Sequence, residues 1–427
     1  MLATRGRVAI VHRAYPWEES NLNELEELCN TAGYEVVYRL FQRRYPHPEY
    51  NIGPSKLGEL KQAVKNLGIS KVIFENELKP LQEYNLAKIL SVEVITRIRL
   101  ILEIFTQHAS NLEAKLQIKL AELKYELPRA REKVKLAKRG EQPGFHGLGA
   151  YEADVYYEEI NRRIHKLSEK LEEIKRKKLS ANLQRRVEGV PVISLAGYTN
   201  AGKTTLFNTL TGYEAEVSPQ MFTTLSTKRR LAKIDGKPVY VSDTVGFIKN
   251  VPTLLISSFM STLMEIAEAD LILLVIDASE PVETMREKLD ASLSTLRQIG
   301  VTNTPIIIVL NKNDIAPPTN LEEAAKVIGQ SYPVINISAK RGDNIEGLHR
   351  VVSQFLNSFV LFKASLTYSD EAKWLLQQAY MKGRVIDLKY QDSTIEIIAE
   401  TPLVVAEKIR RLTNPSGFRI IKQESDQ

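Results

Sequence analysis

The residues with the clearest chemical potential form a glycine-rich loop between an apolar run and a helical run. The apolar run is 192–196, and the helical run begins at Thr205. Glycines let backbone N–H groups turn towards phosphate oxygens, and the helix N-terminus adds a partial positive charge. Lys203 is expected to reach the β- and γ-phosphates of a nucleotide, and Thr204 to offer a hydroxyl to Mg²⁺. The predicted phosphate-binding residues are Gly197, Tyr198, Thr199, Asn200, Ala201, Gly202, Lys203, Thr204 and Thr205.

Two segments further along the chain supply candidates for the metal and the γ-phosphate. Thr224 precedes a predicted strand, where its hydroxyl and carbonyl are expected to close onto Mg²⁺ and the γ-phosphate. Asp243 is expected to hold the Mg²⁺ shell through water, and Gly246 to offer its N–H to the γ-phosphate. Thr244 and Val245 lie between them and join the predicted nucleotide site. The predicted catalytic residues are Lys203, Thr224 and Gly246, and the predicted metal ligands are Thr204, Thr224 and Asp243.

A third segment, 311–314, indicates which base the nucleotide carries. Asp314 follows a strand end, so its carboxylate can accept hydrogen bonds from guanine N1–H and the exocyclic amine, which adenine does not match. A site built around a buried hydrogen-bonding group rejects the wrong analogue by about 10⁴ or more. Asn311 is expected to brace the loop and Lys312 to pack its stem over the base. A backbone N–H to guanine O6 is expected from Ser338, Ala339 and Lys340. The predicted ligand is GTP or GDP.

Two positions modify this expectation. Ras-like switches place a water-orienting glutamine after the glycine that Gly246 represents, whereas this chain has Phe247. We therefore expect slow turnover that a partner stimulates. Asn200 occupies a position at which certain dimerising GTPases ligate potassium, so K⁺ is a second candidate cofactor after Mg²⁺.

The composition limits the class of protein that carries these motifs. The chain has 427 residues, 43% hydrophobic content, a net charge of +6 and a single cysteine, Cys29. One cysteine excludes an internal disulfide framework, and no apolar run reaches the length of about 18 residues that a membrane span needs. We expect a monomeric cytoplasmic protein with about three domains and no membrane or DNA partner.

The segment before the phosphate loop predicts two different architectures. Residues 1–90 alternate short apolar strands with amphipathic helices, which indicates a small parallel α/β domain. Residues 91–187 instead repeat apolar residues in steps of three and four, which predicts a long antiparallel helical hairpin, a coiled-coil rod with its tip near 140–150.

Basic residues gather beside the glycine-rich tip of this predicted rod. On a projecting rod they suit contact with the phosphate backbone of a structured RNA, although a solvated helix face is the simpler alternative for any charge run. The RNA-contact candidates are Arg129, Arg131, Lys133, Lys135, Lys138 and Arg139.

The remaining chain predicts two more domains. Residues 188–358 are expected to form an α/β P-loop GTPase domain with a mixed sheet and helices on both faces. Residues 359–427 follow the order βαββαβ, which is typical of a ferredoxin-like α+β domain. No metal-ligand cluster or nucleophile–base pair stands out elsewhere in the sequence.

The ordered motifs resemble those of the HflX family of ribosome-associated GTPases over nearly the whole chain. The resembling segments are 31–33, the loop with Pro48, Tyr50, Ile52 and Gly53, 115–123, 127–129, 197–203 and 243–248. Phe247 is the residue that this family carries after the glycine. One departure is the tip, 144–152, where many members have an Arg-Gly-Pro-Gly-Glu-like sequence.

The resemblance implies binding to the large ribosomal subunit and its rRNA, with the rod tip near the peptidyl-transferase region. It also implies a role in splitting or rescuing stalled ribosomes under stress. ATP binding by the N-terminal domain is reported in the family, but residues 1–90 contain no P-loop. Two alternatives stay open: a GTP-gated regulatory protein whose rod recruits a protein or another RNA, and an ATP-driven remodeller that Asp314 argues against.

Overall fold

The computed structural model describes residues 5–109, 111–138, 150–213, 228–244, 246–248, 260–356, 359–391, 393–413 and 417–421. Within helices, the structure describes only the backbone at residues 131, 133–138, 150–154, 178–188, 260–262 and 327. Thr224, Val245, Arg139 and the expected tip up to residue 149 therefore lie outside the described residues. The described chain forms two compact units that meet in sequence between Ile174 and Lys175.

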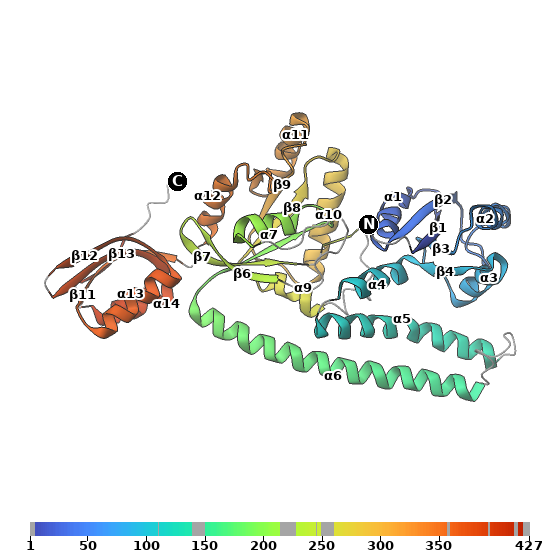
Figure 1. The fold of residues 1–427 in the computed structure, drawn as a ribbon, viewed down its shortest axis with the longest axis horizontal. Coiled ribbons are helices and arrows are strands. Elements are labelled where there is room, and N and C mark those ends of the chain that lie inside the picture. Colours follow the sequence, from blue (N-terminus) through green and yellow to red (C-terminus); the bar gives the residue numbers. More distant parts are fainter. Residues whose placement is uncertain are drawn as a thin grey trace. The chain divides into compact units, whose positions relative to one another are not determined.

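The first unit begins with a four-stranded parallel sheet (Figure 1), in the order β2-β1-β3-β4. The strands are β1 Gly6–Ala14, β2 Tyr34–Arg43, β3 Lys71–Phe74 and β4 Glu93–Thr96. The helices that cover the sheet are α1 Leu22–Thr31, α2 Pro54–Leu67, α3 Pro80–Leu90 and α4 Arg97–His108. A core of Val, Ile, Leu and Phe side chains joins the sheet to α2 and α3. Helices α1 and α4 bury apolar side chains as well, as expected for parallel strands covered on both faces.

This sheet extends beyond the predicted domain boundary at residue 90. Residues 93–96 form a strand beside β3 rather than the start of the helical rod. Val94 and Ile95 are each only 3% exposed, so burial in the sheet outweighs the helical spacing that begins at Ile98. The break after α4 separates the α/β domain from the long helices.

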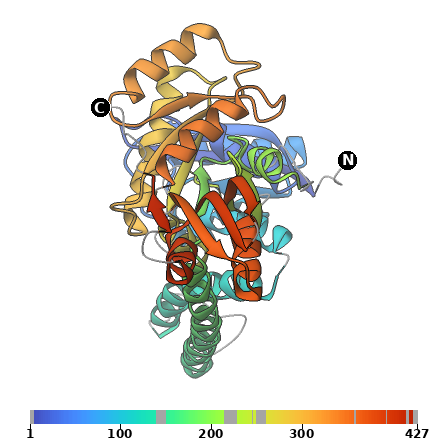
Figure 2. The ribbon, with the colours of Figure 1, turned by 90° about the vertical axis from the view of Figure 1, so that its left-hand side faces the viewer.

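Two long helices follow, α5 Leu112–Lys138 and α6 Ala150–Glu188. They lie side by side (Figures 1 and 2), and Leu123 and Ala130 of α5 share a buried cluster with Ile160 of α6. Pro128 lies inside α5, and the helix continues beyond it to Lys138.

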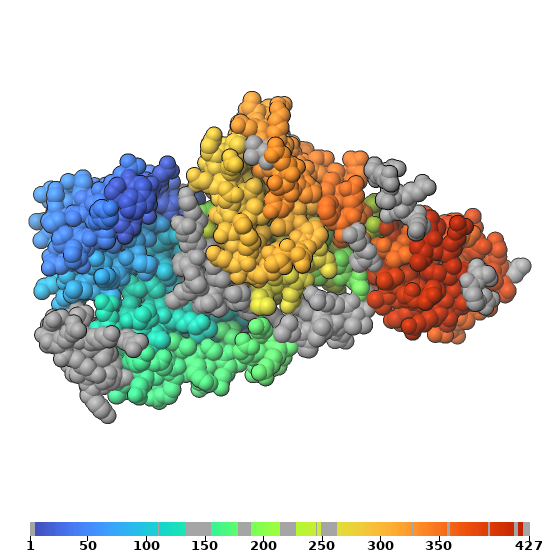
Figure 3. Space-filling model, turned by 180° about the vertical axis from the view of Figure 1, so that it is seen from behind, coloured from blue at the N-terminus to red at the C-terminus, as the bar shows by residue number. Residues whose placement is uncertain are grey.

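The second unit contains a six-stranded mixed sheet in the order β10-β9-β8-β5-β7-β6, with only β6 antiparallel to its neighbour. The strands are β5 Val192–Gly197, β6 Lys228–Ile234, β7 Lys237–Asp243, β8 Leu271–Asp277, β9 Ile306–Asn311 and β10 Val334–Asn336. The helices are α7 Lys203–Thr211, α9 Met260–Ala267, α10 Val282–Gln298, α11 Pro318–Ile328 and α12 Ile345–Phe355. Helices α7 and α12 share one buried cluster with the sheet, and α10 and α11 lie at the surface in yellow and orange (Figure 3).

The second unit also contains an antiparallel sheet in the order β12-β13-β11-β14 (Figure 2). Its elements are β11 Phe359–Thr367, α13 Asp370–Lys382, β12 Arg384–Gln391, β13 Thr394–Pro402, α14 Leu403–Leu412 and β14 Phe418–Ile420. The helices pack on one face of this sheet through a shared apolar core. In the part of the chain that the structure describes, no helix combines the length and apolarity needed to cross a membrane.

Candidate functional site

The glycine-rich loop connects β5 to α7, and two of its glycines are sterically required. Gly197 has a φ of 138°, and a Cβ there would lie 2.2 Å from the carbonyl oxygen of Val275. Gly202 has a φ of 92°, and a Cβ there would lie 2.2 Å from Nδ2 of Asn311. Because no side chain fits at either position, the loop backbone packs directly against β8 and the end of β9.

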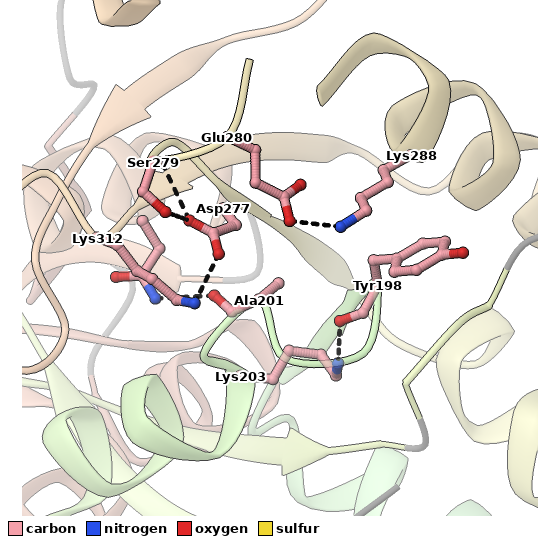
Figure 4. A network of polar contacts seen from close by, with 9 residues as sticks. Tyr198, Ala201, Lys203, Asp277, Ser279, Glu280, Lys288 and Lys312 are labelled. Atoms are coloured by element: carbon pink, nitrogen blue, oxygen red, sulfur yellow. Dashed lines mark hydrogen bonds and ion pairs between the residues drawn. The ribbon is translucent and has the colours of Figure 1, made fainter. Parts of the chain in front are cut away.

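The ammonium group of Lys203 is held inside this loop (Figure 4). Its Nζ donates to the carbonyl oxygen of Tyr198 at 2.8 Å and to that of Gly197 at 3.1 Å. Burial lowers the pKa of Lys203 to about 8, against the opposing effect of the Asp243 carboxylate. A buried ammonium gains strongly from an anion placed beside it, which suits the predicted role of Lys203 as a phosphate ligand.

The predicted metal ligands Thr204 and Asp243 lie together. Oγ1 of Thr204 donates to Oδ2 of Asp243 at 2.9 Å, and Asp243 is fully buried at the end of β7. Thr244 fixes this strand end, because its hydroxyl donates to the carbonyl oxygen of Leu195 in β5 at 2.7 Å. Magnesium prefers hard oxygen ligands, so this pair fits the predicted Mg²⁺ site, whereas Thr224 lies outside the described residues.

The segment around Gly246 is bonded to the glycine-rich loop through the backbone. Phe247 N–H donates to Gly197 O at 2.9 Å, and Thr199 N–H donates to Phe247 O at 2.8 Å. A Cβ on Gly246 would lie 2.8 Å from Thr199 Cγ2 and 3.0 Å from Lys203 Nζ. The Phe247 side chain is only 2% exposed. Phe247 therefore anchors this segment and, as expected, presents no group that could orient water.

The side chain of Asn311, predicted to brace the base-binding loop, connects two loops of the candidate site. Its Nδ2 donates to Ala201 O at 2.9 Å, and its Oδ1 accepts from Ala339 N–H at 2.9 Å. Thr209 of α7 donates from Oγ1 to Ala339 O at 2.7 Å. One amide thus ties the phosphate loop to the 338–340 loop, and Thr209, which sequence reasoning missed, adds a second tie.

Asp314 is positioned by Ser338. The Ser338 hydroxyl donates to Oδ1 of Asp314 at 2.7 Å, and Arg341 Nε lies 3.7 Å from Oδ2. The hydrogen bond from Ser338 is the main cause that lowers the pKa of Asp314. The ionised carboxylate can accept two hydrogen bonds from a guanine edge.

Asp277 is a further residue of the candidate site, and the sequence motifs assign it no role. Its Oδ2 lies 2.6 Å from Nζ of Lys312, and its Oδ1 accepts from the backbone and hydroxyl of Ser279 at 3.0 and 2.6 Å (Figure 4). Asp277 ends β8 directly beside Asn311 at the end of β9. The signal available in the sequence was its place after a fully apolar strand.

A second missed group surrounds Tyr198 (Figure 4). Lys288 of α10 lies 4.9 Å from the centre of the Tyr198 ring and 2.5 Å from Oε1 of Glu280. This cation–π contact holds the phosphate loop from the side of α10.

The other predicted nucleotide residues have fewer contacts. Asn200 is exposed, with a φ of 62°, and Lys340 is exposed as well. Thr205 is half-buried in the first turn of α7, and its carbonyl accepts from Thr209.

Arg129, predicted to contact RNA, is instead buried within the first unit. It is 9% exposed and donates from Nη2 to Leu78 O at 3.1 Å. Its guanidinium also lies 3.3 Å from Glu83, 3.8 Å from Glu77 and 3.9 Å from the centre of the Tyr125 ring. This corrects the prediction for Arg129, because burial and carboxylate partners leave it inside the fold. The side chains of Arg131, Lys133, Lys135 and Lys138 are not described.

Together, the fold and these contacts define a P-loop GTPase. Family models agree, since residues 192–312 match "50S ribosome-binding GTPase", 19–106 match "GTP-binding GTPase N-terminal" and 108–185 match "GTP-binding GTPase Middle Region". The chain is 39% identical over 418 residues to GTPase HflX of Thermococcus kodakarensis, covering 94% of each chain. This chain belongs to the HflX family, and it hydrolyses GTP.

Other relatives give the same match. GTPase HflX of Thermofilum pendens is 45% identical over 351 residues, which cover 81% of this chain and 82% of the relative. Among solved structures, the crystal structure of SsGBP and GDP complex is 32% identical, covers 82% of this chain and 98% of that chain, and has a TM-score of 0.49.

Proposed function

We propose that this chain is a GTP-dependent switch that associates with the large ribosomal subunit and its rRNA, in ribosome splitting, rescue or a stress response. The observation that carries the proposal is the backbone connection between Phe247 and the phosphate loop. Gly246 lies beside Lys203 and Thr199. A γ-phosphate that contacts Gly246 would therefore act directly on the segment that contains Gly246 and Phe247. The family-model description of residues 192–312 as a ribosome-binding GTPase supports the choice of partner.

The chemistry follows from the residues at the phosphate end of the site. Lys203 binds the β- and γ-phosphates and stabilises the charge that develops during attack of water. Thr204 directly, and Asp243 through water, would hold Mg²⁺, which supplies charge neutralisation when bound, and Thr224 is proposed as the third ligand. Gly246 orients the γ-phosphate with its N–H. Since Phe247 is buried, turnover is slow until a partner supplies or arranges the water-positioning group.

We propose that α5 and α6 act as an antiparallel rod that reaches the ribosomal RNA. Their shared apolar cluster supports a paired arrangement. The RNA contacts are assigned to Arg131, Lys133, Lys135, Lys138 and Arg139, without Arg129. The strand order of the C-terminal sheet and its two helices support a ferredoxin-like domain.

Cosedimentation with purified large subunits tests the proposal. We expect binding with a non-hydrolysable GTP analogue, weaker binding with GDP, and a steep loss of binding as salt rises, because each phosphate contact releases counterions. The lysines Lys133, Lys135 and Lys138 changed together to Gln should reduce the salt slope. The matched control changes three exposed cations on α6, Arg162, Arg163 and Lys166, and should leave the slope unchanged.

If cosedimentation with large subunits depends neither on salt nor on the three lysines, the RNA contact is rejected. That result would favour the alternative, a rod that recruits a protein under control of GTP.

A potassium ion beside Asn200 completes the proposed site. Asn200 has a left-handed backbone, with a φ of 62°, at the exposed rim of the phosphate loop. We expect faster GTP turnover in K⁺ than in Na⁺, and loss of this difference in Asn200→Ala. Equal rates in the two salts would remove potassium from the site.

A further inference from the structure

The carboxyl edge of the first sheet carries three ordered aromatic side chains outside the nucleotide site. The rings of Tyr15 and Trp17 are stacked, with centroids 5.1 Å apart and planes 5° from parallel. Tyr45 meets both rings by its edge, at 5.7 Å from Tyr15 and 6.2 Å from Trp17. We call these three residues the aromatic platform. Edge contacts with two neighbours fix the orientation of the stacked pair.

Arg13 supports the platform from within the fold. Its guanidinium carbon lies 4.4 Å from the centre of the Tyr15 ring, and the residue is only 6% exposed. Its Nε donates to Asn51 Oδ1 at 3.1 Å, and Nη1 donates to Arg44 O at 3.4 Å. Arg13, Tyr15 and Trp17 therefore form a ladder of flat groups that is anchored at its buried end.

The outer end of this ladder is open to solvent. Trp17 is 70% exposed and Tyr45 is 62% exposed. A single exposed aromatic residue needs no explanation, but these two belong to one rigid, pre-oriented group. The group that would extend the ladder is another flat aromatic ring, and a nucleobase on an aromatic side chain contributes about 1–3 kcal/mol.

The position in the fold is one where ligands bind. Open α/β sheets bind ligands outside the carboxyl ends of their strands, and β1 and β2 are neighbours in the order β2-β1-β3-β4. Tyr15 and Trp17 follow β1, and Tyr45 follows β2. The loop that continues from Tyr45 is held by Gln82, whose Nε2 donates to His47 O at 2.9 Å.

The charges nearby favour a strand with a phosphate backbone. Arg43 is exposed and Arg44 is half-buried at the end of β2, next to Tyr45. Two acidic residues follow Trp17. Glu18 uses Oε2 to accept from Tyr15 N–H at 2.8 Å, so it is bonded within its own turn, and Glu19 is exposed. Arginine and aromatic groups together are the usual means of binding unpaired bases.

We propose that the aromatic platform stacks on an unpaired base of single-stranded RNA, with Trp17 as the contacting ring and Arg43 and Arg44 beside the backbone. Paired bases are stacked within their duplex and are not available to the platform. The proposal needs neither GTP nor the ribosome, so its failure and that of the proposed function are separable.

The test uses the two tryptophans of the chain, Trp17 and Trp374. In full-length Trp374→Phe, with GDP saturating the nucleotide site, the fluorescence reports Trp17 alone. Addition of a single-stranded oligoadenylate of about ten nucleotides should quench it in a saturable way. A duplex of the same length should not. Absence of quenching by the single strand, or equal quenching by the duplex, would overturn the proposal.

A second measurement separates stacking from a structural effect. Fluorescein-labelled oligoadenylate should bind Trp17→Leu about tenfold more weakly than the parent chain, whereas Trp17→Phe should retain most of the affinity. Trp374→Leu is the matched control, because Trp374 is also exposed, and it should bind like the parent. Unchanged binding by Trp17→Leu would reject the platform, and full competition by AMP at equal concentration would assign it to mononucleotides instead of RNA.

Discussion

The two α/β sheets of this chain both place polar chemistry at the carboxyl ends of parallel strands, but they build it differently. At the GTP site the backbone itself forms the site, because Gly197, Gly202 and Gly246 leave no room for a Cβ. At the edge of the N-terminal sheet, buried side chains form a network of ion pairs. Arg97 lies between Glu24 and Glu75, and Arg129 lies beside Glu83. A site formed by the backbone requires a fixed spacing of residues along the sequence, whereas a network of side chains requires no particular spacing.

This difference predicts opposite responses to substitution. A backbone site should lose function from one added methyl group while the fold persists. A side-chain network should lose stability first, because each removed partner leaves another group buried without compensation.

The largest expected effect tests the backbone site. Gly246→Ala places a Cβ 2.8 Å from Thr199 and 3.0 Å from Lys203, so GTP turnover should fall by about 100-fold. Thermal unfolding should move little. Gly58→Ala is the matched control, because a Cβ there meets nothing within 4 Å, and its turnover should equal that of the parent. Turnover retained in Gly246→Ala would show that the close approach is not needed.

The next effect concerns pH and the N-terminal network. Burial raises the pKa of Glu75 from 4.5 to about 7, although Arg97 opposes the shift. The folded state therefore binds a proton that the unfolded state releases. The contribution of Glu75 to the free energy of unfolding is therefore fully present below pH 4.5 and is lost as the pH rises through about 7. This contribution is at most about 3 kcal/mol.

Urea unfolding of Trp374→Phe, followed at Trp17, should show this loss between those pH values, and Glu75→Gln should flatten it. An identical pH slope in both proteins would reject the role of Glu75.

Arg129→Ala tests a second buried side chain of the N-terminal network. It removes contacts to Leu78 O, Glu83 and the Tyr125 ring, so the first unit should lose about 2 kcal/mol of unfolding free energy, less than for a fully buried pair because Glu83 is about one-third exposed. RNA affinity should change little. Lys119→Ala on the same helix, with its exposed ion pair to Glu122, is the control and should be nearly neutral. A neutral Arg129→Ala with a large loss of RNA affinity would restore the surface role.

The smallest expected effect is at Asp277. Loss of its ion pair with Lys312 in Asp277→Ala should weaken GDP binding about tenfold, with little change in the maximal rate at saturating GTP. Asp290→Ala on α10, at an exposed position, is the control. Equal affinities for the two variants would show that Lys312 needs no positioning by Asp277.

The same contrast explains what could be predicted from the sequence. Asn311 and Asp314 could be proposed from the sequence because a guanine site needs them at fixed positions after a strand. Asp277 and Lys288 could not, since a strand-end acid and a helix lysine have no required spacing to the motifs. Val94 and Ile95 show the limit for the fold, because pairing with β3 depends on residues more than 20 positions away, which helical spacing alone does not reveal.

The most direct test asks whether the base bound at Asp314 controls binding to the large ribosomal subunit. In Asp314→Asn the amide can donate to the 2-oxygen of xanthine but cannot accept the two guanine hydrogen bonds. We expect this variant to cosediment with large ribosomal subunits in the presence of a non-hydrolysable XTP analogue, and not with the GTP analogue. Cosedimentation driven by the GTP analogue as in the parent chain would contradict the account.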